Sequence, residues 1–438
     1  MILVPDAVTQ IRRYSPYDGS STAANLQTQY QSSLLYKLAK STSTNGQCVS
    51  NGCKILPPSP KGNAPGPLYQ WTTGLDANSS STALYSPSSS KHVNLPLNSA
   101  DSHLSVDQEG FVVLPNGAGY ILSDEYGPYI HFALPSGEII YSLRPPPAIV
   151  PQTSDGTDRF TAETQPAAGR ADNQGFEALT FDVKTSTLWA MLQSATIQDS
   201  VGGDKTTNRN TRLFGWTLPN GGDFRKIASP DVQLKYEYAV QLPASKKGKT
   251  YAQSEMTIID STTFLVLSRD GNGFGDTSSS SGYKQADLIS TKAATNLAGT
   301  AYDQPGTPIA PQGTLLSSIT PVAYASFVNL IDPAQLAKFG LHNGGAIDAN
   351  LIASKLESLA IAPAGDASAP DDYLLFVVSD NDFITANGHQ KAQVGANATY
   401  AGDWVDQPYS DAYAQQYGSA DTQLFVYRLT LPGFDQFS

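Results

Sequence analysis

Short apolar runs separated by turn residues predict many β-strands from about residue 105 onward. Runs such as "GFVVLP", "TFLVLS" and "YLLFVV" are rich in branched and aromatic side chains and end at Pro, Ser or Asp. Such side chains fit a pleated, half-buried surface and favour strands. Long apolar periodicity of helical type is absent, and the best short-helix candidate is "AQLAKFGLHNGG", which stops at Gly. The pattern therefore predicts an all-β fold.

A repeat organises these strands. Four stretches open with a Glu and an apolar strand, beginning at Glu109, Glu177, Glu255 and Glu357. Each is followed by a turn, a second strand that ends on a polar residue, and a third strand; "EIIYSLRP" and "YEYAVQLP" are fourth-strand candidates. Repeated units of about four antiparallel strands are typical of a β-propeller. The units exceed a minimal blade, and we assign the excess to polar loops at 145–172, 194–211, 271–282 and 297–350.

We interpret residues 1–438 as a single propeller domain with long polar loop insertions. Residues 1–40 contain the strand-like pieces "TQIRRY" and "SSLLYKLA" and read as a partial blade. Residues 41–104, rich in Ser, Asn, Gly and Pro, read as a variable low-complexity loop. Residues 105–438 hold the four recognisable blades, and the total number of blades stays open.

Charge and composition exclude several classes of partner. The formal net charge is −12 and the sequence pI is about 4.8, so nucleic acid and anionic membrane surfaces are poor partners while cations are favoured. No run of 18 apolar residues exists, which excludes a membrane-spanning helix. We expect a monomer that acts on a small molecule.

Several features favour secretion. Asn78 and Asn397 begin glycosylation sequons, and Cys48 and Cys53 in "CVSNGC" are spaced for a small disulfide. Chance sequons and two free thiols are the alternative. The start "MILVPDAVTQIRRYSP" is no signal peptide because its apolar run is too short. We therefore expect that the chain lacks its true N-terminus.

The recurring carboxylates predict an acidic mouth of the propeller channel. The first strand of each blade lines the channel, so Glu109, Glu177, Glu255 and Glu357 are expected to form a ring at one end of it. Antiparallel pairing returns the second strands to the same end. A further set of acids should join the ring there: Asp124, Glu125, Asp270, Asp380 and Asp382.

Crowded carboxylates raise one another's pKa or bind a cation. Oxygen ligands suit Ca²⁺ best, whereas the scarcity of His and Cys disfavours a transition metal. The predicted calcium ligands are Glu109, Asp124, Glu177, Glu255, Asp270, Glu357, Asp380 and Asp382. Two alternatives stay open: each Glu can instead accept backbone N–H groups of the adjacent blade, and the other acids can serve as turn or surface carboxylates.

Basic and amide side chains near these acids are candidates for binding an anionic group. They are Arg170 and Asn173 in "GRADNQGFE", Arg269 beside Asp270, and His342 and Asn343 in "FGLHNGG". Plain ion pairs are the alternative for the charged members. The chain has no G-x-S-x-G elbow, P-loop or dinucleotide fingerprint.

These motifs resemble the phytase-like family, also described as "esterase-like activity of phytase", especially its fungal members. The likeness is carried by "EGFVVLPNGAGYILSDEYGPYIHF", "GRADNQGFEALTFD", "FLVLSRDGNGFG", "KFGLHNGGAIDA" and "LLFVVSDNDFIT", in order, over roughly residues 105–430. The resemblance implies a secreted, hydrolase-like propeller, and its name points to cleavage of phosphate or other esters.

Three functional hypotheses follow. The first is a Ca²⁺-dependent hydrolase in which Glu125 or Glu177 orients a water, Arg170 or Arg269 holds a phosphate oxygen, and Asn173, His342 and Asn343 help to bind substrate. The second is a non-catalytic propeller that binds a ligand or partner and uses calcium structurally. The third is a lactonase or carboxylic-ester hydrolase.

Overall fold

The structure is a computed structural model that describes residues 8–14, 72–73, 76–77, 79–81, 95–97, 104–135, 139–222, 232–394 and 403–431. Within these residues it is mainly β, with few helices. The strands of the four large sheets are β6 (Gln108–Val113), β7 (Tyr120–Asp124), β8 (Ile130–Ala133), β9 (Ile139–Leu143), β10 (Phe176–Asp182), β11 (Thr187–Leu192), β12 (Asn210–Thr217), β13 (Gln233–Gln241), β14 (Ala252–Asp260), β15 (Thr263–Arg269), β16 (Lys284–Ser290), β17 (Ala323–Asn329), β18 (Leu356–Pro363), β19 (Asp372–Ser379), β22 (Thr422–Thr430) and β1 (Val8–Tyr14).

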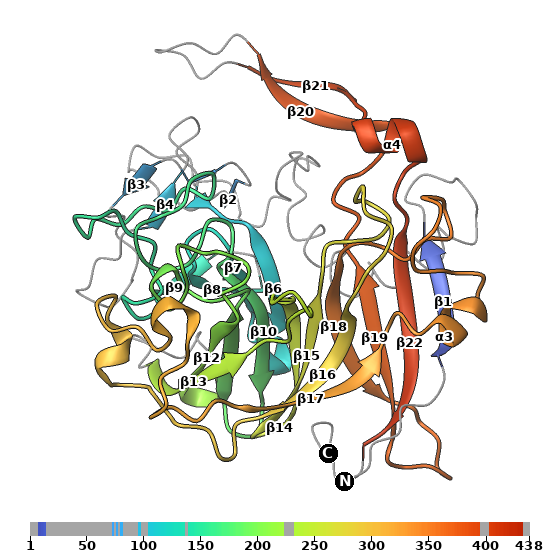
Figure 1. Ribbon diagram of the computed structural model, residues 1–438. Helices are drawn as coiled ribbons and strands as arrows, with labels where there is room; N and C mark the ends of the chain where they lie inside the picture. The colour runs from blue at the N-terminus through green and yellow to red at the C-terminus, as the bar shows by residue number, and fades with distance from the viewer. Residues whose placement is uncertain are drawn as a thin grey trace.

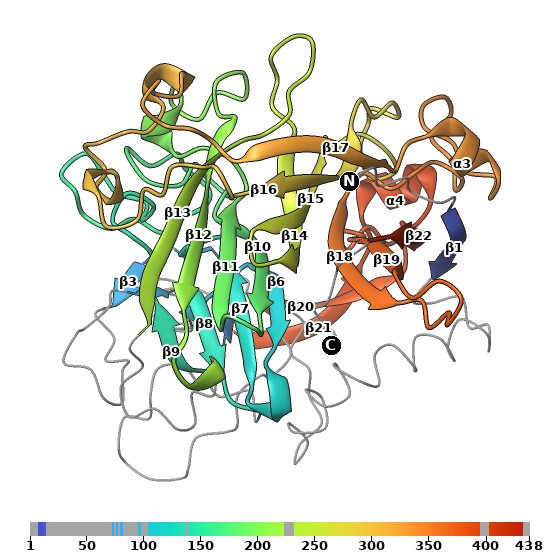
Figure 2. The same ribbon diagram turned by 90° about the horizontal axis from the view of Figure 1, so that it is seen from below.

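These strands form a four-blade β-propeller, which confirms the predicted fold class (Figure 1). The blades have the orders β6-β7-β8-β9, β10-β11-β12-β13, β14-β15-β16-β17 and β18-β19-β22-β1, and every pairing in them is antiparallel. The inner strands contact one another in succession, β6 with β10, β10 with β14 and β14 with β18. Figure 2 shows the four sheets side by side from below.

The last blade is completed by the beginning of the chain. β1, the strand predicted from "TQIRRY", pairs with β22 so that Ile11 lies opposite Phe425 and Arg13 opposite Gln423. The first and last described strands are therefore neighbours in one sheet (Figure 1).

Apolar side chains fill the spaces between adjacent blades. Ile121 and Phe132 of the first blade pack with Leu188 and Phe214 of the second in one cluster. Trp189 of the second blade packs edge-on against Phe264 of the third, with ring centroids 5.1 Å apart. Because the core is divided among these interfaces, the position of β10 depends on β6 and β14, and that of β14 depends on β10 and β18.

Two predicted loops contain strands. The range 297–350 includes β17, which is the fourth strand of the third blade. The sequence pattern does not reveal β17 because this outer strand is mostly exposed and lacks an apolar face. The range 41–104 contains β2 (Thr72–Thr73), β3 (Ser79–Ser81) and β4 (Leu95–Leu97), which join β5 (Leu104–Ser105) in a small sheet.

The predicted short helix is present as α3 (Pro333–Ala337). Asp332 caps it, because the Asp332 side chain accepts hydrogen bonds from the backbone N–H groups of Ala334 and Gln335. Pro333 occupies the first turn, where its missing N–H has no cost.

The long connection between β16 and β17 is fastened to the second blade by a buried ion-pair network. The Arg212 guanidinium lies 2.7 Å from Asp199 Oδ2 and 2.8 Å from Glu237 Oε1, and all three side chains are fully buried. Asp199 Oδ1 also accepts hydrogen bonds from the backbone N–H groups of Ile309 and Ala310. The extra length of this repeat unit therefore forms an ordered strap over its neighbour.

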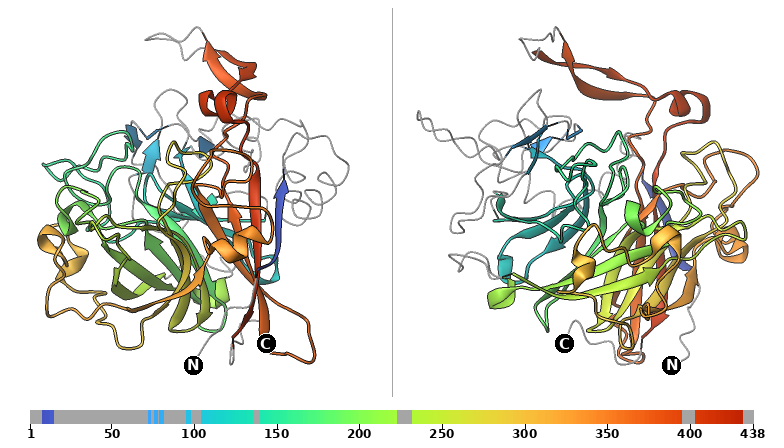
Figure 3. Two further views of the ribbon diagram at one scale, coloured as in Figure 1. Left: turned by 45° about the vertical axis from the view of Figure 1, so that its right-hand side comes forward. Right: turned by 60° about the vertical axis from the view of Figure 1, so that its left-hand side comes forward.

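An insertion between β19 and β22 projects from the fourth blade. It comprises the hairpin β20 (Gly388–Val394) and β21 (Asp403–Tyr409), followed by α4 (Ala412–Tyr417). Figure 3 shows the hairpin standing away from the body of the molecule in two further views. No helix in the described part of the chain is both long and apolar enough to cross a membrane.

Candidate functional site

The four repeated Glu residues lie near the starts of the four inner strands. Glu109 is in β6, Glu177 in β10, Glu255 in β14 and Glu357 in β18. The pairing of each inner strand with its neighbour shifts register at or beside its Glu. Such a bulge re-aims a side chain that regular alternation would place on one face of the sheet. The repeat therefore carries a local distortion as well as an acidic residue.

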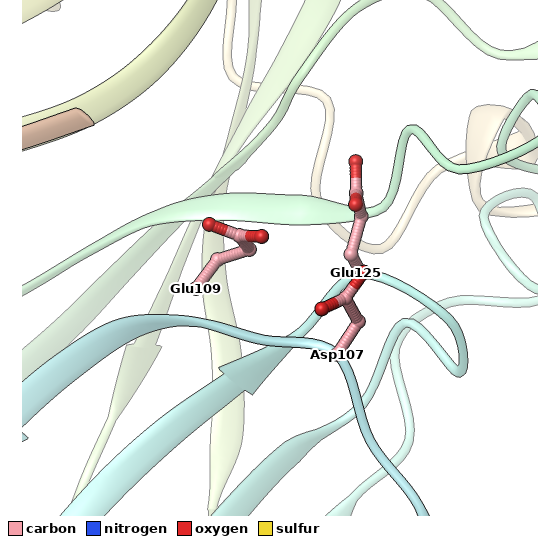
Figure 4. Close-up of side chains that lie close together, drawn as sticks. All are labelled: Asp107, Glu109 and Glu125. Atoms are coloured by element: carbon pink, nitrogen blue, oxygen red, sulfur yellow. The ribbon is translucent and has the colours of Figure 1, made fainter. Parts of the chain in front are cut away.

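Three carboxylates come together at the first blade (Figure 4). Asp107 immediately precedes β6, Glu109 lies within β6, and Glu125 follows β7. Each offers an oxygen atom, and these atoms all lie within 4.8 Å of one another. Glu125 is buried, whereas Asp107 and Glu109 are partly exposed. This geometry lets one cation contact all three side chains.

Glu177 of the second blade joins this group through Gln193. The Gln193 side-chain amide donates hydrogen bonds to Glu125 Oε1, at 3.2 Å, and to Glu177 Oε1. Glu177 is only 3% exposed, and its Oε2 has no hydrogen-bond partner within the described residues. A buried carboxylate oxygen without a partner is costly and is explained when it binds an ion or a water molecule. We call Asp107, Glu109, Glu125 and Glu177 the mouth cluster.

Burial raises the pKa of every member of the mouth cluster, and repulsion by nearby carboxylates adds to the effect. Burial is the main cause for Glu125 and Glu109, whose pKa values are also raised by the charge of Glu177. Burial and then the charge of Glu357 raise the pKa of Glu177 to about 7. Burial and the charge of Asp124 raise the pKa of Asp107 to about 6. A divalent cation among these groups would reverse the effect by favouring the ionised carboxylates.

Glu357 faces the cluster from the fourth blade but is already paired. The Arg269 guanidinium of β15 forms a salt bridge with Glu357 Oε1. Arg269 Nε is buried and has no hydrogen-bond partner within the described residues. Nearby, Lys355 Nζ lies 3.2 Å from Asp382 Oδ1 and 3.9 Å from Asp380 Oδ2. The mouth is therefore acidic on the first two blades and carries both signs of charge on the last two.

Asp124 organises the turn that presents Glu125. Its Oδ1 accepts hydrogen bonds from the backbone N–H groups of Asp107 and Tyr126, and its Oδ2 accepts one from Gly127 at 2.8 Å. Asp124 is fully buried. These bonds tie the residue before β6 to the residues after β7. The hydrogen bonds are those of a turn carboxylate, and its assignment as a metal ligand stays a prediction.

Glu255 and Asp270 also make hydrogen bonds that are expected of structural carboxylates, which was the alternative to metal binding. Glu255 Oε1 accepts from the backbone N–H groups of Leu179 in the neighbouring blade and of Met256, so it links two blades. Asp270 accepts from Gly282 N, at 2.6 Å, and from Ser281 Oγ within its own loop. Their assignments as metal ligands likewise stay predictions.

Arg170 is completely buried and is engaged by backbone carbonyls. Its guanidinium donates to the carbonyl oxygens of Tyr126, Phe160, Thr161 and Ala171. Because the Tyr126 carbonyl belongs to the turn after Glu125, Arg170 supports that turn. This arrangement favours a positioning role over the predicted direct contact with a phosphate oxygen.

The predicted substrate-binding residues are spread over two loops. Asn173 is exposed just before β10, with φ of 46°. Both Asn343 side-chain atoms bind the backbone of Ser281, and His342 contacts Gly344 O and Asp348 Oδ1. Their roles in binding substrate stay predictions. The predicted disulfide residues Cys48 and Cys53 and the sequon residues Asn78 and Asn397 lie outside the described residues.

Sequence reasoning missed Asp107, Gln193 and Lys355. Asp107 and Lys355 each lie two residues before a repeated Glu, Glu109 and Glu357, at the entrance to an inner strand. Residues at this spacing share a face of a strand, so the repeat itself held a signal for both. Gln193 directly follows β11, in the position that an acid occupies in the other units, and an amide gave no reason to assign it to a site.

Comparison with known proteins gives two matches. A family model described as "Phytase-like: Esterase-like activity of phytase" matches residues 71–383. The chain is also similar to an uncharacterized secreted protein of Arthroderma benhamiae, with 33% identity over 314 residues. That alignment covers 65% of this chain and 59% of the relative, so the chain spans less than two thirds of the length of the relative that it matches.

Proposed function

This chain belongs to the phytase-like family, and from that premise we propose that it is a secreted hydrolase that cleaves a phosphate ester or a related ester at a calcium-bridged acidic mouth of the propeller channel. The relative described as secreted supports the proposed location. The substrate, the ion and the secretion of this chain are parts of the proposal.

One observation carries the proposal. Asp107, Glu109 and Glu125 of the first blade come together, Gln193 links Glu125 to Glu177 of the second blade, and Glu177 Oε2 is buried without a partner within the described residues. Carboxylates supply only oxygen donors, which is the ligand type that Ca²⁺ prefers. The residues therefore fit a calcium ion better than a transition metal, for which His and Cys ligands would be expected.

The carboxylates and the neighbouring Arg269 divide the chemistry between them. Asp107, Glu109 and Glu125 would hold the ion, which would offset their charge and polarise the ester oxygen when bound. Glu177, held by Gln193 through Oε1, has its Oε2 free to accept a proton from the attacking water. The free Nε–H of Arg269 is available to donate a hydrogen bond to an anionic oxygen of the substrate.

A non-catalytic propeller with structural calcium is the second candidate. It is favoured by Glu255, which uses its carboxylate to link two blades. In that case chelation would lower the melting temperature without any loss of turnover. A lactonase or carboxylic-ester hydrolase would use the same cluster on another substrate.

The decisive experiment measures hydrolysis of phytate, p-nitrophenyl phosphate, p-nitrophenyl acetate and a lactone with Ca²⁺ and with excess EGTA. We expect a phosphate ester to be cleaved with Ca²⁺ only, and Glu177→Gln to reduce the rate by about 100-fold because the proton acceptor is lost. Glu163→Gln, at an exposed position, is the matched control. Hydrolysis that continues unchanged in EGTA would reject the metal-dependent mechanism, and the absence of turnover with every substrate would favour the binding protein.

A further inference from the structure

We propose that Lys284 is a positioning residue: it fixes the Arg269 guanidinium as the group that binds an anionic oxygen, so that the ester cleaved at the mouth carries a negative charge. The inference rests on the proposed function because it assumes that Arg269 binds an oxygen of the substrate. It names the class of substrate and assigns a role to a buried lysine that the mechanism above does not use.

Lys284 is a fully buried cation at the junction of the third and fourth blades. It begins β16 and lies directly opposite Arg269 of β15 in the sheet. Its Nζ donates hydrogen bonds to the carbonyl oxygens of Asp270, at 3.2 Å, and of Ser354, at 2.5 Å, and lies 3.8 Å from Asp270 Oδ1. Asp270 follows β15 of the third blade, whereas Ser354 lies shortly before β18 of the fourth. One ammonium group therefore binds the main chain of both blades.

The Asp270 carbonyl connects Lys284 to Arg269 through direct contacts. Arg269 Nη1 donates to this same oxygen atom at 3.5 Å, and Arg269 Nη2 forms the salt bridge with Glu357 Oε1. Glu357 lies three residues after Ser354, so Lys284 binds the main chain close to both partners of that salt bridge. The third nitrogen of the guanidinium, Nε, has no hydrogen-bond partner within the described residues. Lys284 thus helps to determine where this free donor lies.

The two segments that Lys284 joins are also hydrogen-bonded to each other. Phe274 N donates to Ile352 O at 2.8 Å, and Ser354 N donates to Phe274 O at 2.9 Å. The segments approach so closely that a Cβ atom on Gly273 would lie only 2.5 Å from Ile352 O. A buried ammonium group is costly unless its donors are paired. The protein contacts, and not solvent, therefore determine the position of the Lys284 ammonium group.

This arrangement favours an anionic ligand over a neutral one. The Arg269 side chain is 13% exposed, so a ligand can reach part of it. A guanidinium forms stronger hydrogen bonds with a charged oxygen than with a neutral one. A binding group whose supporting contacts fix it beforehand also loses less free energy when the ligand binds. The recognised chemistry is therefore an anionic ester, in preference to a neutral ester of the same size.

The test is a double-mutant cycle on Lys284→Met and Arg269→Gln, measured by isothermal titration calorimetry without any turnover. Dilute inorganic phosphate is titrated into each Ca²⁺-saturated protein. We expect phosphate to bind about tenfold more weakly to Arg269→Gln, which loses the charged donor. Lys284→Met should weaken phosphate binding by about three- to tenfold, because the guanidinium is no longer held in place. The double variant should bind at most about twofold more weakly than Arg269→Gln, since both changes remove the same interaction.

The controls separate this effect from a general loss of structure. Lys247→Met removes an exposed lysine elsewhere and should leave phosphate binding unchanged. The Ca²⁺ affinity of Lys284→Met should stay within about twofold of the wild type, because the three carboxylates proposed to hold the ion belong to the first blade. Lys284→Gln keeps a hydrogen-bond donor at this position, and it takes the place of Lys284→Met in the cycle if the methionine variant does not fold.

Non-additive losses are the expected signature, since a lysine that only stabilised the fold would act independently of Arg269. Additive losses, unchanged phosphate binding by Lys284→Met, unchanged binding by Arg269→Gln, or a wild type that binds no phosphate would overturn the inference. The hydrolase proposal fails separately: non-additive losses without cleavage of any ester would reject catalysis alone. Cleavage of a phosphate ester together with additive losses would reject the role of Lys284 alone.

Discussion

A single uncharged side chain, Gln193, brings the two most buried carboxylates of the mouth together. Its side-chain amide donates to both Glu125 and Glu177. Its backbone N–H donates to Gly175 O, and its backbone carbonyl accepts from Gln253 N in the next blade. Because the backbone N–H and the backbone carbonyl of Gln193 are both hydrogen-bonded, its side-chain amide is held between the two carboxylates. The amide is neutral, so it bridges them without adding another charge.

Replacing Gln193 should therefore impair the mouth cluster while leaving all of its carboxylates in place. Gln193→Met removes the shared donor, and we expect Ca²⁺ affinity to fall by about 10- to 100-fold, the usual cost of losing a group that orients metal ligands. Calorimetric titration with Ca²⁺ measures the change, and Gln416→Met, at an exposed position on α4, is the control. Equal affinities for Gln193→Met and the wild type would show that the amide does not orient the ligands.

At the scale of elements, the turn after β7 and the segment before β10 are in close van der Waals contact. Gly175 precedes β10, and a Cβ atom at this position would collide with the backbone of Glu125. The two segments belong to different blades, so this contact sets how far Glu125 lies from Glu177. Glycine is required at this position because a side chain would not fit. Its backbone conformation is not the reason, since Gly175 is not among the glycines with positive φ.

We expect Gly175→Ala to push the Glu125 turn away from the second blade. Overpacking of this kind costs about 1–3 kcal/mol of unfolding free energy, and the displaced carboxylate should also weaken Ca²⁺ binding. Urea denaturation and Ca²⁺ titration measure the two effects. Gly306→Ala is the matched control, because a Cβ there meets open space among the described residues. A loss of stability with unaltered Ca²⁺ affinity would argue against this contact as a determinant of the site.

At the scale of the whole molecule, the crowded acids link folding to pH. The folded-state pKa values of Asp107, Glu177 and Glu255 are raised to about 6, about 7 and about 8, chiefly by burial. Glu237 belongs to the buried ion-pair network with Arg212 and Asp199, and its pKa is raised to about 7 for the same reason. Such groups favour the folded state below their ordinary pKa, and this contribution is lost as pH rises through the folded-state values.

Without a divalent cation, the free energy of unfolding should therefore decrease as pH rises from about 5 to about 7. A group that differs by a full proton between the two states contributes about 1.4 kcal/mol per pH unit. Above that window Lys284 opposes the trend, because burial lowers its pKa to about 7. We expect Ca²⁺ to make the free energy of unfolding depend less steeply on pH. Urea denaturation at a series of pH values, in EGTA and in Ca²⁺, measures this dependence. Stability that increases with pH in EGTA over this range would contradict the assigned burial of the acids.

The repeat was readable from the sequence because a blade is a local structure. Alternation, turn residues and the leading Glu at 109, 177, 255 and 357 predicted the inner strands correctly. The outer strands were harder to predict. β17 was missed because it buries little apolar surface, and the pairing of β1 with β22 joins residues at opposite ends of the chain.

The amino-acid sequence by itself determined the all-β propeller, the family and the acidic residues at the starts of the inner strands, since these depend on periodicity and motifs within short segments. Only the tertiary structure decided which acids meet. Glu255 turns to the backbone of its neighbour and Glu357 pairs with Arg269, while Glu109, Glu125 and Glu177 converge. The reason is that bulges and contacts between blades aim each side chain, and those contacts join residues that are far apart along the chain.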